Sequence, residues 1–493
     1  MGTAPPAGAI PLTLPGTTTP VDVSGSVDGL AVVDTGGGPR QRPQALTELR
    51  FQAHPTRPLH LQLTLRGRAG GPFEGGQPGV MNFAYEFQNR TPSLEWNEAW
   101  AELRQGDFQL RAGIQKFAWG KLDGGPPTDV LTPRDLHDPL VRDFEESKIG
   151  IPAIQGTYYL PPVDALGLSE LRATLVYVPF AVPSRVALVD ERWFPPSVDP
   201  TSEFRFTASE AERVFGAAVP VRIPVTLHTR NDRPARAFTD GGVALRLGGS
   251  WLGADWDLYH YTGPETGPDA ELDVTVMGKL VTPTLVRAPA DLHLRQTSDT
   301  IHMTGFAGSA VLRGVTVRME SAFFVNRPYL RDSRDLFTPA ALAAIPKKQR
   351  DHILDQVLAG RRAQVPVGEL FPDRDSVEWG IGADYLINGF VPLVQVNQVI
   401  FTDAGPSQLL ANPDTRLLAS LRRRFLQDAL ELEIRGLYEF ERDAWFVMPR
   451  VSYRLGDHWR FRFGYLAIGG PSDSLLGQYH ANDEFLLESK YFF

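Results

Sequence analysis

The residues of this sequence that could do chemistry are arginines and carboxylates that recur at every second position of short segments. Between positions 430 and 440, Glu431, Glu433 and Arg435 alternate with leucine, isoleucine and aromatic side chains. Successive side chains of a β-strand point to opposite faces, so each such segment would have one charged and one apolar face. The charged set along the chain is Arg66, Arg68, Arg111, Arg318, Glu320, Glu378, Asp384, Arg422, Arg424, Glu431, Glu433, Arg435, Arg450, Arg460 and Arg462. Fixed charges of this kind either pair across neighbouring strands or face water and sort ions by their sign.

A second group of charges lies in the segment 119–149, between tight bends at 124–127 and 132–133. Its members are Lys121, Asp123, Asp129, Arg134, Asp135, His137 and Asp138. The spacing of its aspartates matches no calcium-binding loop, and no neighbouring residue supports a role of His137 as a general base. The sequence has no Gly-x-Ser-x-Gly, no His-Glu-x-x-His and no phosphate-binding glycine loop. We therefore expect no catalytic residue, no metal site and no cofactor, and we predict that the protein is not an enzyme.

The elements that must position these charges are antiparallel strands. Eighteen segments qualify: 21–33, 45–54, 59–68, 94–105, 107–118, 150–160, 170–179, 241–250, 254–262, 301–312, 315–325, 377–387, 390–402, 416–426, 430–440, 447–453, 459–465 and 485–493. Their connections are alternately short, as at Asn388-Gly389, and long, as at 181–240. The segment 271–297 is either a hairpin outside the main sheet or two more strands of it, so sixteen and twenty strands are alternatives to eighteen. An even number of strands, with the long loops all on one side of the sheet, predicts an all-β protein that forms a single transmembrane barrel.

Composition agrees with a barrel and excludes several other classes. Gly 46 and Pro 41 are spread along 493 residues, which disfavours long helices. No window holds the ~18 consecutive apolar residues of a membrane-spanning helix, so insertion would have to use strands. The absence of cysteine excludes disulfides and zinc–cysteine sites and suits a bacterial envelope protein. The net charge of −9 disfavours a nucleic-acid partner.

The chain divides into a flexible N-terminal segment, 1–20, and a barrel, 21–493. We expect the loop 119–149 to fold into the lumen and constrict it, and the loop 326–374 to be extracellular and partly helical. The stretch 338–362 in the second loop is the only good helix candidate in the sequence. The first residues have no basic and apolar signal-peptide pattern, so the sequence reads as a mature chain. Aromatic residues such as Trp379, Tyr453 and Trp459 are expected to form girdles at the membrane interface, with a sugar-stacking track as the alternative.

Two stretches of sequence carry a family resemblance. The C-terminal segment 482–493, with Tyr491 and Phe493, resembles the final-strand signal of Gram-negative outer-membrane porins. The segments 97–103, 111–120 and 127–136 look like those of uncharacterised porin-like families related to alginate-export barrels. The resemblance implies a place in the bacterial outer membrane, contact with the lipid bilayer and lipopolysaccharide, and assembly by the barrel-assembly machinery. It also implies an arginine-lined lumen for a polyanion, although the carboxylates of the lumen and the net −9 depart from that pattern.

Three functions compete at this point. The first is a channel for passive diffusion of small hydrophilic or charged solutes. The second is an export conduit for an anionic polysaccharide or lipid that works with periplasmic partners. The third is a soluble secreted enzyme using carboxylates such as Glu431 and Glu433, which lie about 7 Å apart on one strand face. Short turns leave little periplasmic surface for docking, which favours the first.

Overall fold

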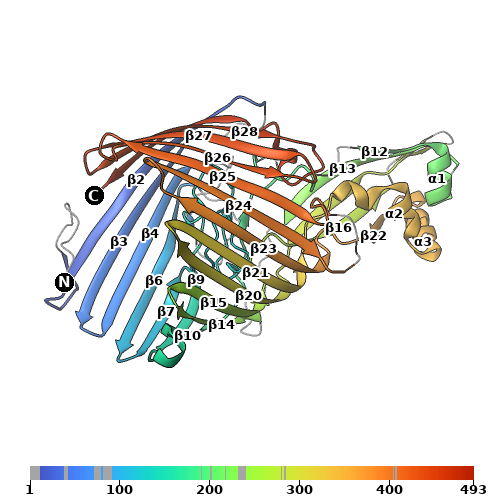
Figure 1. Ribbon diagram of the computed structural model, residues 1–493. Helices are drawn as coiled ribbons and strands as arrows, with labels where there is room; N and C mark the ends of the chain where they lie inside the picture. Colours follow the sequence, from blue (N-terminus) through green and yellow to red (C-terminus); the bar gives the residue numbers. More distant parts are fainter. Residues whose placement is uncertain are drawn as a thin grey trace.

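A computed structural model describes residues 12–37, 43–71, 79–81, 91–189, 191–199, 203–216, 218–230, 240–278, 280–282, 285–403, 405 and 408–493. Within these ranges the chain forms a closed antiparallel barrel and a smaller α/β body that projects from one end of it (Figure 1). No helix in these ranges is long and apolar enough to cross a membrane.

The barrel has eighteen strands, as the sequence predicts. They are β2 (Pro20–Asp34), β3 (Gln44–Thr56), β4 (Leu59–Gly70), β6 (Ser93–Gln105), β7 (Phe108–Gln115), β9 (Ile151–Tyr159), β10 (Leu168–Val178), β14 (Gly242–Trp251), β15 (Ala254–Pro264), β20 (Thr300–Leu312), β21 (Val315–Pro328), β23 (Asp373–Tyr385), β24 (Phe390–Phe401), β25 (Asp414–Phe425), β26 (Leu430–Glu439), β27 (Ala444–Leu455), β28 (Trp459–Gly469) and β29 (Glu484–Phe492). Each pairs with the next, and β2 pairs with β29 from Ser26 opposite Phe492 to Asp34 opposite Glu484. Closure leaves no unpaired sheet edge.

The two ends of the barrel differ in the length of their connections. At the end that holds both termini, turns such as Asn388-Gly389 and Arg313-Gly314 join the strands (Figure 1). Asn388 has φ 50° and Gly389 φ 80°, which is the left-handed backbone that a two-residue hairpin turn needs and that this residue pair tolerates. The other end has the long loops between β7 and β9, β10 and β14, β15 and β20, and β21 and β23.

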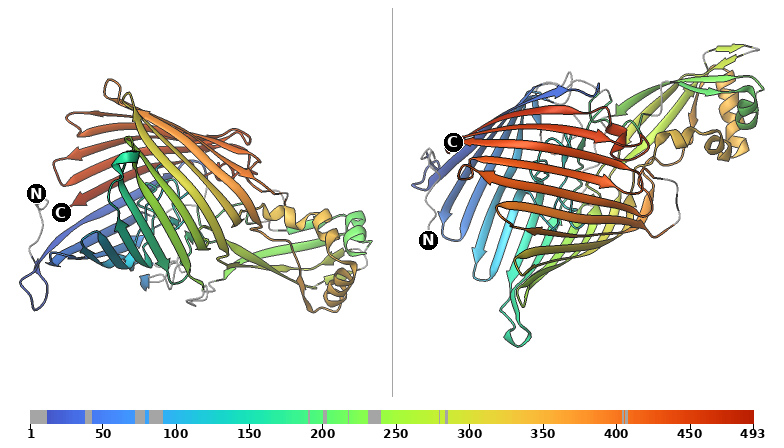
Figure 2. Two further views of the ribbon diagram at one scale, coloured as in Figure 1. Left: turned by 60° about the horizontal axis from the view of Figure 1, so that its bottom comes forward. Right: turned by 45° about the horizontal axis from the view of Figure 1, so that its top comes forward.

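Three of these long loops combine into the projecting body, which we call the loop domain (Figure 2). Its sheet contains β12 (Glu203–Phe206), β13 (Val221–Arg230), β16 (Ala270–Met277), β17 (Leu280–Thr282), β18 (Leu285–Arg287), β19 (Ala290–Gln296) and β22 (Arg362–Val365). Its helices are α1 (Ala208–Phe215), α2 (Pro339–Ala344) and α3 (Lys347–Leu358). Segment 271–297 therefore lies outside the barrel, which settles the open strand count.

One helix was not predicted. The loop 326–374 does contain helices, but α1 is a further helix in the loop between β10 and β14. Its start is a capping box, in which Thr207 accepts from the Glu210 backbone N–H and the Glu210 carboxylate accepts from Thr207. The helix is amphipathic, but its eight residues are fewer than the ~11 over which a helical periodicity can be told from that of a strand.

Shorter elements complete the described chain. β1 (Leu12–Thr13) pairs with the start of β2, so residues 12–20 turn back on the barrel, while residues 1–11 lie outside the described residues. The others are β5 (Gly79–Met81), β8 (Asp135–Leu136), β11 (Arg185–Val186) and the 3-10 turns Asp164–Leu166, Ser333–Phe337 and Gly477–Tyr479.

Candidate functional site

The two faces of the barrel have opposite chemistry. Outward side chains such as Val394, Ile434 and Phe463 are 52%, 47% and 50% exposed, while the residues between them carry the charges of the inner wall. Large aromatic side chains, among them Tyr453 and Trp459, also lie on the outer face close to the short turns. An apolar belt around a sheet without edges is what a bilayer requires of a spanning protein.

Most predicted wall residues lie on the inward face and are ion-paired. The pairs are Arg66 with Glu48 (3.3 Å) and Glu95 (3.5 Å), Arg111 with Glu102, Arg318 with Asp384 (2.5 Å), Glu378 with Arg327 (2.7 Å), Arg424 with Glu431 (2.8 Å), Arg450 with Glu433 (2.5 Å), and Arg460 and Arg462 with Glu488 (2.9 and 3.0 Å). Pairing across neighbouring strands satisfies charges that lie inside the barrel. Arg423, on the opposite face of β25, instead stacks on Phe390 and Phe425.

The segment between β7 and β9, residues 116–150, lies against the inner wall, and part of its attachment there is apolar. Trp119, Val130 and Leu131 are each less than 5% exposed and pack in one cluster with Tyr259 and Met303 of the wall. Burying three large apolar side chains contributes several kcal/mol, at about 1.5–3 kcal/mol for each. The segment is therefore held firmly to the side of the barrel built from β9 to β21.

Glu320 fixes the bend of this segment. Its carboxylate accepts hydrogen bonds from the backbone N–H groups of Lys121 and Leu122 and from the Thr128 hydroxyl, at 2.7 Å and 2.9 Å for the last two. The Asp123 N–H donates to Gln395 on β24 at 3.0 Å. A carboxylate predicted as part of the wall thus holds the loop.

The far side of the same segment meets a group of arginines. Asp143 lies 3.5 Å from Arg435, 3.0 Å from Arg450 and 3.4 Å from Arg462, which belong to β26, β27 and β28. Burial alone would raise the pKa of the Asp143 carboxyl, but Arg450 and Arg462 lower it to about 2. Asp143 is therefore a carboxylate at neutral pH and links the loop to three strands across the lumen.

A buried network joins the loop to β4 and β6. Arg68 donates to Asp135 at 2.6 Å, and Arg185 donates to Glu95 at 2.6 Å and lies 3.8 Å from Asp135. His137 lies 2.7 Å from Asp135 through Nδ1. Burial would raise the pKa of Asp135, but the neighbouring cations, Arg68 first, hold it well below its usual range.

The remaining loop charges are also paired. Asp129 lies 2.8 Å from Arg134 and 2.9 Å from Lys148, and Gln44 donates to Asp138 at 2.9 Å. Burial raises the pKa of Asp129 against the opposing effect of these two cations. The predicted loop residues are thus gathered in one region, but in several separate ion pairs. Among the described residues, no group of three or more His, Asp or Glu side chains has the arrangement of a metal site.

Several residues of this region were not predicted. Arg185 and Arg192, from the loop between β10 and β14, are 2% and 3% exposed, and Arg192 lies 2.7 Å from Glu484 and 3.1 Å from Asp34. The stretch 185–192 has no strand-like alternation, so its arginines looked like surface residues in the sequence. Asp143 and Lys148 lie within the predicted segment 119–149. Only the partners of Asp143 on distant strands, and those of Lys148 at Asp129 and Glu145 of the loop itself, distinguish the two from solvated charges.

Two charged cavities flank the loop. One, of about 260 Å³, is lined by Asp143, Arg422, Arg424, Asp428, Ala429, Glu431, Arg450, Ser452, Tyr453, Arg454, Arg460 and Arg462. The other, of about 290 Å³, is lined by Ser26, Leu46, Glu48, Arg50, Arg66, Arg68, Asn97, Glu98, Lys116, Asp135, Arg142, Glu145, Glu146, Ser147 and Lys490. The first has six arginines against three carboxylates, and the second has six cations against five carboxylates.

The two residues of the C-terminal signal lie at the seam of the barrel. Tyr491 packs beside Trp459 with ring centroids 4.9 Å apart. Phe493 exchanges backbone hydrogen bonds with Gly25, at 2.9 and 3.1 Å. Recognition by the assembly machinery stays a prediction.

Comparison with known proteins gives structural likeness alone. No family model and no curated protein matches the sequence. Among solved structures, the outer-membrane protein OpdK of Pseudomonas aeruginosa is 8% identical with a TM-score of 0.48, and 96% of this chain and 98% of that one are covered. OccAB3 of Acinetobacter baumannii is 8% identical with a TM-score of 0.46, over 97% and 99%. Wzi of Escherichia coli, a carbohydrate-binding barrel involved in capsule assembly, is 8% identical with a TM-score of 0.44, over 95% and 84%. The relation to alginate exporters expected from the sequence is not shown.

Proposed function

We propose that this protein is an outer-membrane channel through which small hydrophilic solutes diffuse passively, and that its loop 116–150 narrows the lumen. We place the long loops and the loop domain on the extracellular side of the outer membrane and both termini on the periplasmic side, as in other bacterial barrels. The lipid bilayer and lipopolysaccharide surround the belt, and the barrel-assembly machinery inserts the chain.

The observation that carries the proposal is the cavity of about 260 Å³ between Asp143 and strands β25 to β28. It is large enough for several water molecules, and its lining is charged. Six arginines and three carboxylates line it, and Glu433 and Glu488, which pair with Arg450, Arg460 and Arg462, bring the carboxylates to five. The small excess of positive charge favours small anions there over cations.

The loop supports the proposal through the way it is held. Apolar packing fixes it to both walls, through Trp119, Val130 and Leu131 on one side and Val141 on the other, and Asp143 adds ion pairs to the second wall. The width of the path then depends on where the loop crosses between the two walls.

The test is planar-bilayer conductance of the detergent-purified full chain. Wild type is compared with a variant in which residues 123–127, the part that contacts Gln395, are replaced by two glycines. Trp119, Leu131 and Asp129 stay in place, so the apolar attachment is preserved. A shift in electrophoretic mobility on heating verifies that each barrel is folded.

We expect steady ohmic conductance that rises in the variant, and a reversal potential in a salt gradient that indicates anion preference. If wild type and variant are both folded and inserted but neither shows conductance, passive diffusion is contradicted. This result would instead favour the export conduit for an anionic polysaccharide or lipid that opens with a periplasmic partner.

A further inference from the structure

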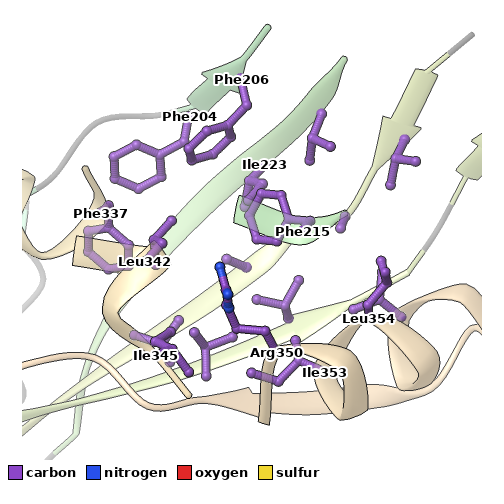
Figure 3. A pocket seen from close by; sticks show the side chains of 18 residues that line it. Phe204, Phe206, Phe215, Ile223, Phe337, Leu342, Ile345, Arg350, Ile353 and Leu354 are labelled. Atoms are coloured by element: carbon purple, nitrogen blue, oxygen red, sulfur yellow. The ribbon is translucent and has the colours of Figure 1, made fainter. Parts of the chain in front are cut away.

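The sheet of the loop domain has one apolar face and one polar face. Phe204, Phe206 and Ile223 line an apolar cavity between the sheet and the helices α1, α2 and α3 (Figure 3). Arg205 and Arg222 alternate with these residues along β12 and β13, so their side chains point to the opposite side of the sheet. Both arginines are exposed there. We call this side of the sheet the polar face.

Three arginines lie in register on the polar face. Arg205 of β12 is opposite Arg222 of β13, and Arg222 is opposite Arg287 of β18. All three are exposed. Neighbouring strands lie about 4.8 Å apart, so the row of arginines is about 10 Å long. Like charges directly opposite one another destabilise a sheet, and a bound anion would relieve that repulsion.

The row of arginines is only partly neutralised. Arg205 lies 2.5 Å from Glu203, and the Arg205 side chain is still 72% exposed. Neither Arg222 nor Arg287 has an ion pair within the part of the chain that the structure describes. The next carboxylate toward the barrel on this side of β19 is Asp291, about 13 Å from Arg287 along the strand. This distance exceeds the screening length of about 8 Å at physiological salt, so the row keeps its positive charge.

Hydrogen-bonding side chains extend the polar face toward the barrel. Thr226 is opposite Asp291, and His228 is opposite His293 with ring centroids 5.1 Å apart. From Arg222 to His228 the face is about 20 Å long. Among the described residues of β12, β13, β16, β18 and β19, no large apolar side chain is exposed. A protein interface needs an apolar centre, so a long charged face without one favours a hydrated polymer as the partner.

The row of arginines lies far from the membrane. β13 runs outward from the end of the barrel (Figure 1). Arg287 lies nine positions before Gln296, where β19 ends close to the start of the barrel strand β20, and nine positions are about 30 Å of extended chain. The headgroup region on each side of a bilayer is only about 5–8 Å thick. On the extracellular side, the row would therefore lie among the polysaccharides of the cell surface rather than among lipid headgroups.

We infer that the polar face of the loop domain binds an anionic polysaccharide. Its carboxylates lie on Arg205, Arg222 and Arg287, and its hydroxyl groups bond to the polar side chains toward His228. A guanidinium group binds a carboxylate through two parallel hydrogen bonds. Several such contacts on one polymer add up, whereas a single sugar acid would bind weakly. The inference takes only the extracellular placement from the proposed function.

The experiment measures binding of the detergent-purified full chain to immobilised polygalacturonate by biolayer interferometry. Neutral dextran of the same length is the control polymer, and a single-stranded DNA of equal charge tests whether charge alone is sufficient. Arg222→Gln/Arg287→Gln removes two charges from the row. Lys347→Gln/Lys348→Gln removes two exposed charges from α3, on the other side of the sheet, and is the matched control. Amide hydrogen exchange of β13 verifies that the loop domain of each variant is folded.

We expect wild type to bind polygalacturonate and not dextran. The variant of the row should bind about tenfold more weakly, which corresponds to about 1.4 kcal/mol, and the variant of α3 should bind like wild type. Unchanged binding of the row variant, or an equal loss in the α3 variant, would overturn the inference. DNA or dextran bound as tightly as polygalacturonate would also overturn it, because the face would then not distinguish an anionic sugar. Binding and conductance are separate measurements, so a silent barrel that binds polygalacturonate contradicts the channel alone.

Discussion

Replacement of Asp143 by asparagine should make the lumen more selective for anions. The change removes one negative charge from the cavity of about 260 Å³ and leaves a side chain of the same size. Arg450 keeps Glu433 as a partner and Arg462 keeps Glu488, so two of the three arginines stay in position. The expected effect is therefore electrostatic.

The magnitude follows from the size of the cavity. A sphere of 260 Å³ has a radius of about 4 Å, and the radii of the ion and the wall atoms add about 3 Å, so an ion at its centre lies about 7 Å from the carboxylate. One elementary charge at about 7 Å in water contributes about 0.6 kcal/mol, close to RT. An anion gains this amount and a cation loses it, so the anion-to-cation permeability ratio should rise about sevenfold.

Reversal potentials of Asp143→Asn and wild type in potassium chloride gradients measure this ratio. The difference should be largest near 0.01 M salt, where the screening length is about 30 Å, and nearly vanish near 1 M, where it is about 3 Å. Asp473→Asn is the matched control, because Asp473 pairs with Arg442 outside both cavities and is 62% exposed. A ratio that does not rise, or one that rises equally at both salt concentrations, would refute the electrostatic reasoning.

Three further perturbations test other parts of the molecule. Glu320→Gln weakens the hydrogen bonds that the loop backbone donates to this side chain. Single-channel recording should therefore show about tenfold more frequent transitions to larger conductance. An unchanged record would mean that Glu320 does not hold the loop. Burial and Asp299 raise the pKa of Asp269 to about 6. Ionisation of Asp269 therefore lowers the free energy of unfolding of the loop domain by up to about 3 kcal/mol. This loss is absent below pH 3.8, the pKa of the unfolded chain, and is complete above about pH 6. Asp269→Asn should accordingly slow amide hydrogen exchange of β16 and β19 at pH 7.5 but not at pH 4, and slowing at both values would contradict the titration. Ile434→Arg on the outer face should lower the free energy of unfolding in urea by about 2–4 kcal/mol. Ser420→Arg, at a similar depth on the inner face, should lower it by less. Equal losses would argue against a lipid-facing belt.

The barrel could be predicted from the sequence because its signal is local. In β26, alternation between Glu433 and Ile434 assigns each side chain to a face without knowledge of any neighbour. The turn at Asn388-Gly389 likewise carries its own conformational preference. Strand number and the inward set of arginines follow from repeating these two local arguments.

The loop domain could not be predicted, because its pairings join three separate loops. β13 pairs in parallel with β19, with His228 opposite His293, across 64 intervening positions that include two barrel strands. Nothing in either segment specifies the other as its partner. The same is true of Arg185, whose burial depends on Glu95 and Asp135 rather than on its own sequence neighbours.

The net charge of −9 and the charge of the path are different quantities. In the cavity beside Asp428 the arginines outnumber the carboxylates six to three, while beside Lys116 the two signs are nearly balanced at six to five. Charges on the outer loops are screened within about 10 Å at 0.1 M salt, whereas those that line a narrow lumen act on every ion that passes. The proposed anion preference is therefore compatible with a net negative charge of the whole protein. Substitutions at Arg422 or Arg454 should change this preference, whereas changes in the overall charge should not.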